Sequence, residues 1–261
     1  MAKKLLEGST ATVNQLIQAE DKYPYQLWKD GKNNNWDPTQ IEMGNDIQQW
    51  KSDTALSADE KLLVKRTLGF FSSTESLVQN NLMLAIQRYV TDGACKQYLA
   101  RQIFEESLHN STMEVCCSAY GLDPDEVANA FNTIPAIKAK TDFLKSVTTD
   151  LFRKDFDIET IAGKQEFIRN VFVFYIICEG VFFFSGFAMI LALGRQNKLN
   201  GLCDQIRYTL RDETIHIKFG THLLNRLRRE YPEAWTTEFE IELWGLLRYA
   251  VDLEILYAQD A

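Results

Sequence analysis

The side chains that could do chemistry in this sequence are carboxylates and imidazoles, and they occur twice in the same order. In each half of the chain a lone glutamate is followed by the motif Glu-x-x-His. The six residues are Glu75, Glu106, His109, Glu179, Glu213 and His216. Because residues i and i+3 share one face of a helix, each motif can present a carboxylate and an imidazole side by side.

Four carboxylates and two imidazoles form a suitable ligand set for a pair of divalent metal ions. The carboxylate oxygens offset the charge of two cations, and one imidazole on each metal leaves positions open for dioxygen. Two helices with Glu-x-x-His motifs and two with single glutamates build the dinuclear site of ferritin-like carboxylate proteins. The sequence therefore predicts an all-α, ferritin-like helical bundle with a dinuclear metal site in its core.

A solvated helix face is the ordinary structural explanation for a single Glu-x-x-His motif. Here, however, Glu179 is the only charged residue from Val171 to Leu193. Burying an unpaired carboxylate in such surroundings would cost several kcal/mol, so Glu179 should be protonated or bound to metal. The duplicated motif inside apolar helices therefore favours a metal site.

Long helices are expected to position these residues, because the chain has only 5 prolines and 13 glycines and its apolar residues recur at helical spacing. A capping-box pattern that starts at Ser57 precedes a helix expected to reach about Gln87. A second helix is expected to open near Thr91 or Asp92 and to close at Gly121. These two helices carry the candidate ligands of the first half.

Two further long helices are expected to carry the candidate ligands of the second half. The stretch from Phe167 to Leu193 is apolar on nearly every face, which is typical of a central buried helix or a membrane span. No second span accompanies it, so no membrane partner is expected. The other long helix is expected from about Asn200 to Arg229. Between the halves, Asp123-Pro124 is expected to start a helix that Pro135 ends.

Composition and charge argue against several other classes of protein. The 28 basic and 36 acidic residues give a net charge of −8, so no nucleic-acid partner is expected. Five cysteines form no C-x-x-C pair and leave an odd one over, which argues against a disulfide framework and a thiolate zinc site. The N-terminal residues lack the apolar segment of a secretion signal, so a cytoplasmic protein is expected.

Two motifs, Glu106-Ser-Leu-His109 and Arg211-Asp-Glu-Thr-Ile-His216, resemble the ligand motifs of class I ribonucleotide reductase small subunits. The resemblance runs from the segment around Trp36 to the last helix. It implies a ribonucleoside-diphosphate reductase small subunit whose dinuclear metal site activates dioxygen. That site would supply the oxidising equivalent to a large-subunit partner, and the resemblance also implies a homodimer.

The segments around Glu75 and Glu179 look most like the manganese/iron subgroup of this family, in which the first ligand is Glu rather than Asp. Met113 stands where the tyrosyl-radical members have their radical-bearing tyrosine. A thioether cannot hold a long-lived phenoxyl-type radical, so the oxidising equivalent would stay on the metals or move elsewhere. Tyr120 and Tyr175 lie at helical offsets from the ligands and are candidate radical sites, although packing in the core is the more ordinary role for both. Mn/Fe is favoured, and Fe/Fe and Mn/Mn stay open because the same ligands accept all three.

Two residues outside the ligand set gain a role from the same resemblance. Trp36 and Asp212 would form with His109 a hydrogen-bonded path that carries an electron into the site from the partner. A core tryptophan and a capping or ion-pairing aspartate are the ordinary roles of such residues. Together with the six candidate ligands they favour the path.

We expect one ferritin-like domain over residues 1–261, with an N-terminal segment (1–55) that holds Trp36, metal-binding helices (56–230) and a C-terminal helix (231–261). The sequence stops at Ala261, before the flexible tail that family members carry. Either the tail has been removed or omitted from this sequence, or this is an unusually short member that docks the large subunit differently. Two alternatives use the same ligands, a related dinuclear metal oxidase or hydroxylase and an iron-oxidising storage protein. The storage protein would need no path through Trp36 and Asp212.

Overall fold

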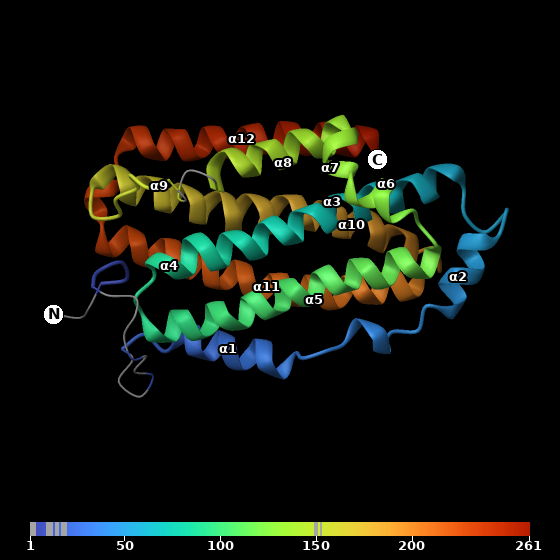
Figure 1. Ribbon diagram of the computed structural model, residues 1–261, viewed down its shortest axis with the longest axis horizontal. Coiled ribbons are helices and arrows are strands. Elements are labelled where there is room, and N and C mark those ends of the chain that lie inside the picture. Colours follow the sequence, from blue (N-terminus) through green and yellow to red (C-terminus); the bar gives the residue numbers. More distant parts are fainter. Residues whose placement is uncertain (1–3, 9–12, 14–15, 17–19, 149–150, 152) are drawn as a thin grey trace.

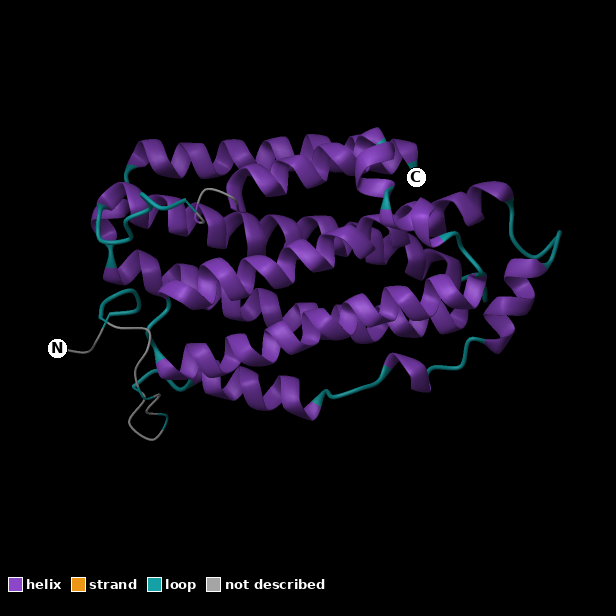
Figure 2. Ribbon diagram, viewed as in Figure 1, coloured by secondary structure: helices purple, strands orange, loops and turns teal. Residues whose placement is uncertain are grey.

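Four long helical segments form the centre of the molecule and run roughly along its longest axis (Figure 1). This computed structural model describes residues 4–8, 13, 16, 20–148, 151 and 153–261, and these contain helices and loops but no strand (Figure 2). The prediction of an all-α chain is confirmed. The central segments are α3 (Ala58–Asn81), α5 (Gly93–Tyr120), the continuous helix α9–η4–α10 (Ile161–Phe172, Val173–Phe183 and Phe184–Gly194) and α11 (Asn200–Glu230).

Further helices cover this centre on two sides (Figure 1). On one side α1 (Tyr23–Asn33) packs on α5 and α11, and on the other α8 (Pro135–Thr148) and α12 (Thr237–Asp260) pack together over η4. Lys140 of α8 is fully buried, and its Nζ lies 2.8 Å from Oε2 of Glu254 on α12. The shorter elements are η1 (Pro38–Gln40), α2 (Gly44–Lys51), η2 (Leu82–Ile86), α4 (Gln87–Tyr89), α6 (Pro124–Ala128), α7 (Ala130–Thr133) and η5 (Pro232–Ala234).

The ends of α3 and α5 follow from hydrogen bonds at the residues that the sequence singles out. The Ser57 side chain accepts a hydrogen bond from the Glu60 backbone at 3.1 Å, and the Glu60 carboxylate accepts one from the Ser57 backbone at 2.9 Å. This reciprocal pair is a capping box. Asp92 caps α5, and Gly121 ends it in the left-handed region at φ 62°. The predicted start of the first helix and both predicted ends of the second are confirmed.

Among the residues that the structure describes, two π-helical segments interrupt the regular helices. Helix α3 continues through η2 into α4, so the helix predicted to reach about Gln87 reaches Tyr89. The longer π segment, η4, has 11 residues and contains Glu179. Such segments occur frequently at functional sites. Hydrophobic spacing in the sequence did not predict either of them.

The segment between the two halves of the chain differs from the expectation. The sequence predicts one helix from Asp123-Pro124 to Pro135, but the chain forms two short helices, α6 and α7, and Pro135 begins α8. Proline suits a first helical position, because its missing N–H has no helical partner there and its fixed φ matches the helix.

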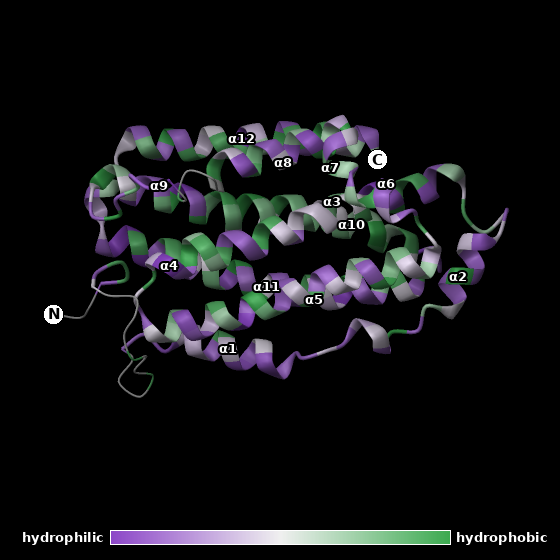
Figure 3. Ribbon diagram, viewed as in Figure 1, coloured by the Kyte–Doolittle hydropathy of each residue, from purple (hydrophilic) through white to green (hydrophobic). Residues whose placement is uncertain are grey.

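The helix α9–η4–α10 is long and apolar enough to cross a membrane by length and composition. It is the one such helix among the described residues, and 50% of its most apolar window is buried by the rest of the protein. It packs against α11 and α12, and most of η4 and α10 is hydrophobic (Figure 3). Its position is therefore that of the central helix of a bundle.

Candidate dinuclear metal centre

The six predicted side chains meet in the centre of the bundle, and all six are fully buried. Their potential ligand atoms form two overlapping groups, and within each group these atoms lie within 4.8 Å of one another. Glu106 and Glu213 belong to both groups, whereas the other four side chains belong to one group each. The two groups are Glu75, Glu106, His109 and Glu213, and Glu106, Glu179, Glu213 and His216.

Glu106 on α5 and Glu213 on α11 each face both imidazoles. One oxygen of Glu213 lies 3.1 Å from Nδ1 of His109, and its other oxygen lies 3.0 Å from Nδ1 of His216. The two oxygens of Glu106 lie 3.6 Å and 3.2 Å from the same two nitrogens. The imidazole ring centroids are 6.0 Å apart. Both carboxylates are therefore placed to bridge two metal ions, each with one imidazole.

The electrostatics of these buried groups indicate that positive charge belongs between them. Burial raises the pKa of Glu75 to about 8 and the pKa of Glu179 well above its ordinary value. Burial would also raise the pKa of Glu213, but the positive charge of His216 and the hydrogen bond from His109 outweigh it and hold the pKa at about 2. Both oxygens of Glu75 lack a hydrogen-bond partner among the described residues. Four buried carboxylates and two inward-facing imidazole nitrogens fit two divalent cations.

Glu75 should contribute to the way in which the stability of the metal-free protein depends on pH. Because its folded-state pKa is about 8 against an ordinary value of 4.5, its contribution to stability is complete below 4.5 and is lost as the pH rises through about 8. We expect the Tm of the metal-free protein to fall over this range. Glu75→Gln should reduce the fall, and each kcal/mol is worth about 2–4 °C for a chain of this size.

Differential scanning calorimetry of the metal-free protein across this pH range measures the effect. Glu114→Gln, at an exposed position on α5, is the control and should leave the pH profile unchanged. A Glu75→Gln protein with the same profile as the unmodified protein would contradict the assignment.

The two imidazoles are also fixed from outside the ligand cluster. Nε2 of His109 lies 3.4 Å from Oδ2 of Asp212, and the Trp36 indole N–H donates to that same oxygen at 2.8 Å. The structure thus brings together the three residues of the predicted path. On the other side, Nε2 of His216 lies 2.9 Å from Oε2 of Glu105.

Sequence reasoning did not find Glu105. It is fully buried, and its other oxygen accepts a hydrogen bond from Nε of Arg101 at 2.7 Å. A signal for it exists in the sequence, because an acidic residue directly precedes each Glu-x-x-His motif, Glu105 in the first and Asp212 in the second.

The two tyrosines considered as radical sites have different surroundings. The Tyr175 hydroxyl donates to the Gln102 side chain at 2.8 Å, and the Gln102 amide donates in turn to Glu179 at 2.9 Å. The Tyr120 hydroxyl instead donates to Asp46, which caps the start of α11 by accepting from the backbone of residues 201 and 202. Tyr175 is thus linked to the ligand cluster by hydrogen bonds, and Tyr120 has a structural role.

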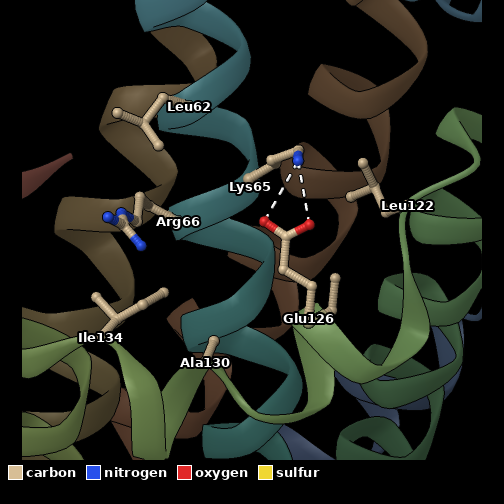
Figure 4. A pocket seen from close by; sticks show the side chains of 8 residues that line it. Leu62, Lys65, Arg66, Leu122, Glu126, Ala130 and Ile134 are labelled. Atoms are coloured by element: carbon tan, nitrogen blue, oxygen red, sulfur yellow. Dashed lines mark hydrogen bonds and ion pairs between the residues drawn. The ribbon is translucent and has the colours of Figure 1, made fainter.

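A small surface pocket offers no comparable set of metal ligands. This pocket lies between α3 and the segment of α6 and α7, beside the exposed ion pair of Lys65 and Glu126 (Figure 4). Its volume of about 30 Å³ accommodates about two water molecules. It contains neither a histidine nor a cysteine, so it does not compete with the buried cluster as a metal site.

Four central helices with this ligand arrangement define a ferritin-like dinuclear metal carboxylate protein. Comparison with known proteins narrows the class. The family model for the ribonucleotide reductase small chain matches residues 13–261. The chain is 46% identical over 258 residues to the ribonucleoside-diphosphate reductase subunit beta of Chlamydia pneumoniae. The aligned residues cover 99% of this chain and 74% of that protein. The chain therefore belongs to the ribonucleotide reductase small-chain family.

Solved structures share the fold at lower identity. A ribonucleotide reductase R2 subunit from Clostridium botulinum superimposes with a TM-score of 0.88 at 23% identity, covering 98% of this chain and 78% of that one. An R2-like ligand-binding oxidase with a reconstituted Mn/Fe cofactor superimposes with a TM-score of 0.72 at 23% identity, covering 93% of this chain and 83% of that one. These similarities confirm the predicted ferritin-like fold. Family membership makes the chain a small subunit of ribonucleoside-diphosphate reductase.

Proposed function

We propose that Glu75, Glu106, His109, Glu179, Glu213 and His216 bind the two metal ions of this small subunit. The observation that carries the proposal is that Glu106 and Glu213 each face both imidazoles from the centre of the cluster. When bound, the metal pair activates dioxygen and supplies the oxidising equivalent for ribonucleotide reduction in the large subunit. The residues of this chain bind the metals, orient the ligands and keep bulk water out of the site.

Buried aromatic side chains on the helices that carry Glu75 and Glu179 support the last of these tasks. Phe71, Phe183 and Phe187 are fully buried, and their rings pack against one another with centroids 5.1 to 6.1 Å apart. Glu179 sits on the same π-helical segment as Phe183. A dry site strengthens the attraction between the carboxylates and the metal ions and protects a strong oxidant from side reactions.

We further propose that Trp36 and Asp212 carry the oxidising equivalent between this site and the large subunit. Asp212 accepts the Trp36 indole proton and, through the same oxygen, faces Nε2 of the candidate ligand His109. Trp36 is only 9% exposed, so its indole is largely shielded from bulk solvent. The unbroken series of contacts from indole to carboxylate to imidazole supports the path.

For the metal identity we propose Mn/Fe, with the oxidising equivalent held on the metals. Met113 is 2% exposed and offers no phenol at the position of the family's radical-bearing tyrosine. Glu75 supplies the first ligand, as in the manganese/iron subgroup that the sequence resembles. A protein of the same fold, an R2-like ligand-binding oxidase, has been reconstituted with a Mn/Fe cofactor, which supports the proposal. A ligand-binding oxidase is the second candidate function, but the match to the small-chain family over residues 13–261 favours the reductase.

Anaerobic loading with Mn(II) and Fe(II) together, followed by oxygen, tests the metal assignment. We expect one Mn and one Fe per chain, a coupled high-valent signal in electron paramagnetic resonance, and no tyrosyl signal. Two irons per chain with a tyrosyl signal would contradict the assignment and would direct attention to Tyr175.

We also propose that the subunit works as a cytoplasmic homodimer with its large-subunit partner. The support is the family match, because the matched relatives are named as subunits of a reductase. Sedimentation at micromolar concentration should give twice the chain mass, and a strict monomer would contradict the homodimer.

A further inference from the structure

The two imidazoles of the candidate metal centre are each held by a carboxylate that comes from the opposite helix. Asp212 lies on α11 beside Glu213, yet it contacts His109 of α5. Glu105 lies on α5 beside Glu106, yet it contacts His216 of α11. The duplicated motif therefore extends by one residue to acid-Glu-x-x-His, and the additional acids are exchanged between the two helices.

Glu105 is placed to control which nitrogen of His216 faces the metal position. A carboxylate at 2.9 Å from Nε2 accepts the proton of that nitrogen, which leaves the Nδ1 lone pair directed at Glu106 and Glu213. A carboxylate or carbonyl that holds the outer nitrogen of a metal-binding histidine fixes both its tautomer and its ring orientation. Glu105 thus meets the geometric requirement for this role.

The two outer carboxylates differ in their own partners. Asp212 accepts a hydrogen bond from the neutral indole N–H of Trp36, and the Arg211 guanidinium lies no closer than 3.9 Å to its other oxygen. Glu105 instead accepts a hydrogen bond at 2.7 Å from the guanidinium of Arg101, which is 11% exposed. Arg101 also donates to the Asn35 side chain at 3.2 Å. The guanidinium neutralises Glu105 and cannot be oxidised under biological conditions, so this contact series offers no site for an electron hole.

Helix α1 is shaped to cover the Glu105 side. A Cβ atom at Gly31 would lie 2.9 Å from Oε1 of Glu105 and 3.4 Å from Cγ of Arg101. Only a glycine lets α1 approach this closely without moving the ion pair. The segment 31–36 therefore contacts both outer carboxylates, Glu105 near its start and Asp212 through Trp36 at its end.

We propose that Arg101 and Glu105 are positioning residues for the metal position at His216, and that they leave electron transfer to the Asp212 and Trp36 side alone. This inference rests on the proposed function, since it assumes that His216 binds metal. It assigns different tasks to the two sides of the centre. On the His216 side, Glu105 and Arg101 orient the imidazole and carry no electron. On the His109 side, Asp212 orients the imidazole and also links it to Trp36 for electron transfer.

Anaerobic titration of the protein with Mn(II) alone tests the positioning role without any turnover. Binding is monitored by calorimetry and by the electron paramagnetic resonance signal of free Mn(II). Glu105→Leu should weaken one of two binding steps by about 10- to 100-fold, the usual cost of losing such a partner, and leave the other step unchanged. Glu105→Gln keeps an acceptor oxygen and should weaken the same step by a smaller factor. It also guards against a Leu variant that fails to fold. Glu126→Gln, in an exposed ion pair, is the control.

A mirror variant shows whether the two carboxylates serve different metal positions. Asp212→Leu should weaken the other step, so the double variant should weaken both. The inference would be overturned if the Glu105 variants left both binding steps unchanged or weakened both steps equally. It would also be overturned if the double variant retained one tight binding step. The proposed function would stand in these cases if the unmodified protein still binds two metal ions per chain.

Discussion

Glu106→Ala is expected to abolish the binding of both metal ions rather than of one. Glu106 faces Nδ1 of His109 and Nδ1 of His216 with its two oxygens, so its loss would remove a candidate bridging ligand from both metal positions. Glu213 would then be left as the single candidate bridge to offset the repulsion between two cations. Charge repulsion at close range in a low-dielectric interior is severe, so we expect no tight dinuclear loading.

The comparison that identifies a bridge uses two other variants. Glu75→Ala removes a residue that belongs to only one ligand group, so it should weaken one binding step and spare the other. Glu114→Ala, on the same helix as Glu106 but exposed, should bind both ions normally. Metal quantification after anaerobic loading gives the result. Retention of two tightly bound ions by Glu106→Ala would show that Glu106 is not a bridging ligand.

Trp36→Phe is expected to keep both metal ions and to lose turnover with the large subunit. Phenylalanine fills most of the same space, but it cannot donate to Asp212 and is much harder to oxidise than an indole. The hydrogen bond of 2.8 Å from Trp36 to Asp212 is lost, whereas all six candidate ligands remain. Metal content should therefore be unchanged while ribonucleotide reduction falls to the background of the assay.

A second tryptophan provides a matched control for this variant. Trp28 lies on α1, is partly buried against the core and stacks on Tyr25. Within the part of the chain that the structure describes, it forms no hydrogen bond or ring contact with the six candidate ligands. Trp28→Phe should keep both metal content and turnover. Turnover in Trp36→Phe equal to that of Trp28→Phe would exclude the proposed path.

The six candidate ligands could be predicted from the sequence because helical geometry is local. Glu106 and His109 must share a helix face at their spacing, and the same holds for Glu213 and His216. The apolar residues around Glu179 predict that its carboxylate is buried, and a buried carboxylate should be protonated or bound to metal. The structure brings all six together, although their role as ligands stays a proposal until metal is measured.

The outer residues could not be predicted in the same way, because they act across helices. Glu105 and His216 are 111 positions apart, and no spacing rule links them. Trp36 and Asp212 are 176 positions apart, and only the resemblance to a family pointed to their contact. The π-helical segment around Glu179 was missed for a related reason, since tertiary packing and not hydrophobic spacing decides where a helix adds a residue to its turn.

A dinuclear centre at this site is tested most simply by X-ray diffraction from crystals of the metal-loaded protein, recorded at the absorption edges of manganese and iron. We expect two anomalous peaks per chain, one beside Glu75 and His109 and the other beside Glu179 and His216, with Glu106 and Glu213 in contact with both. A single peak, or peaks away from these six residues, would contradict a dinuclear centre at this site.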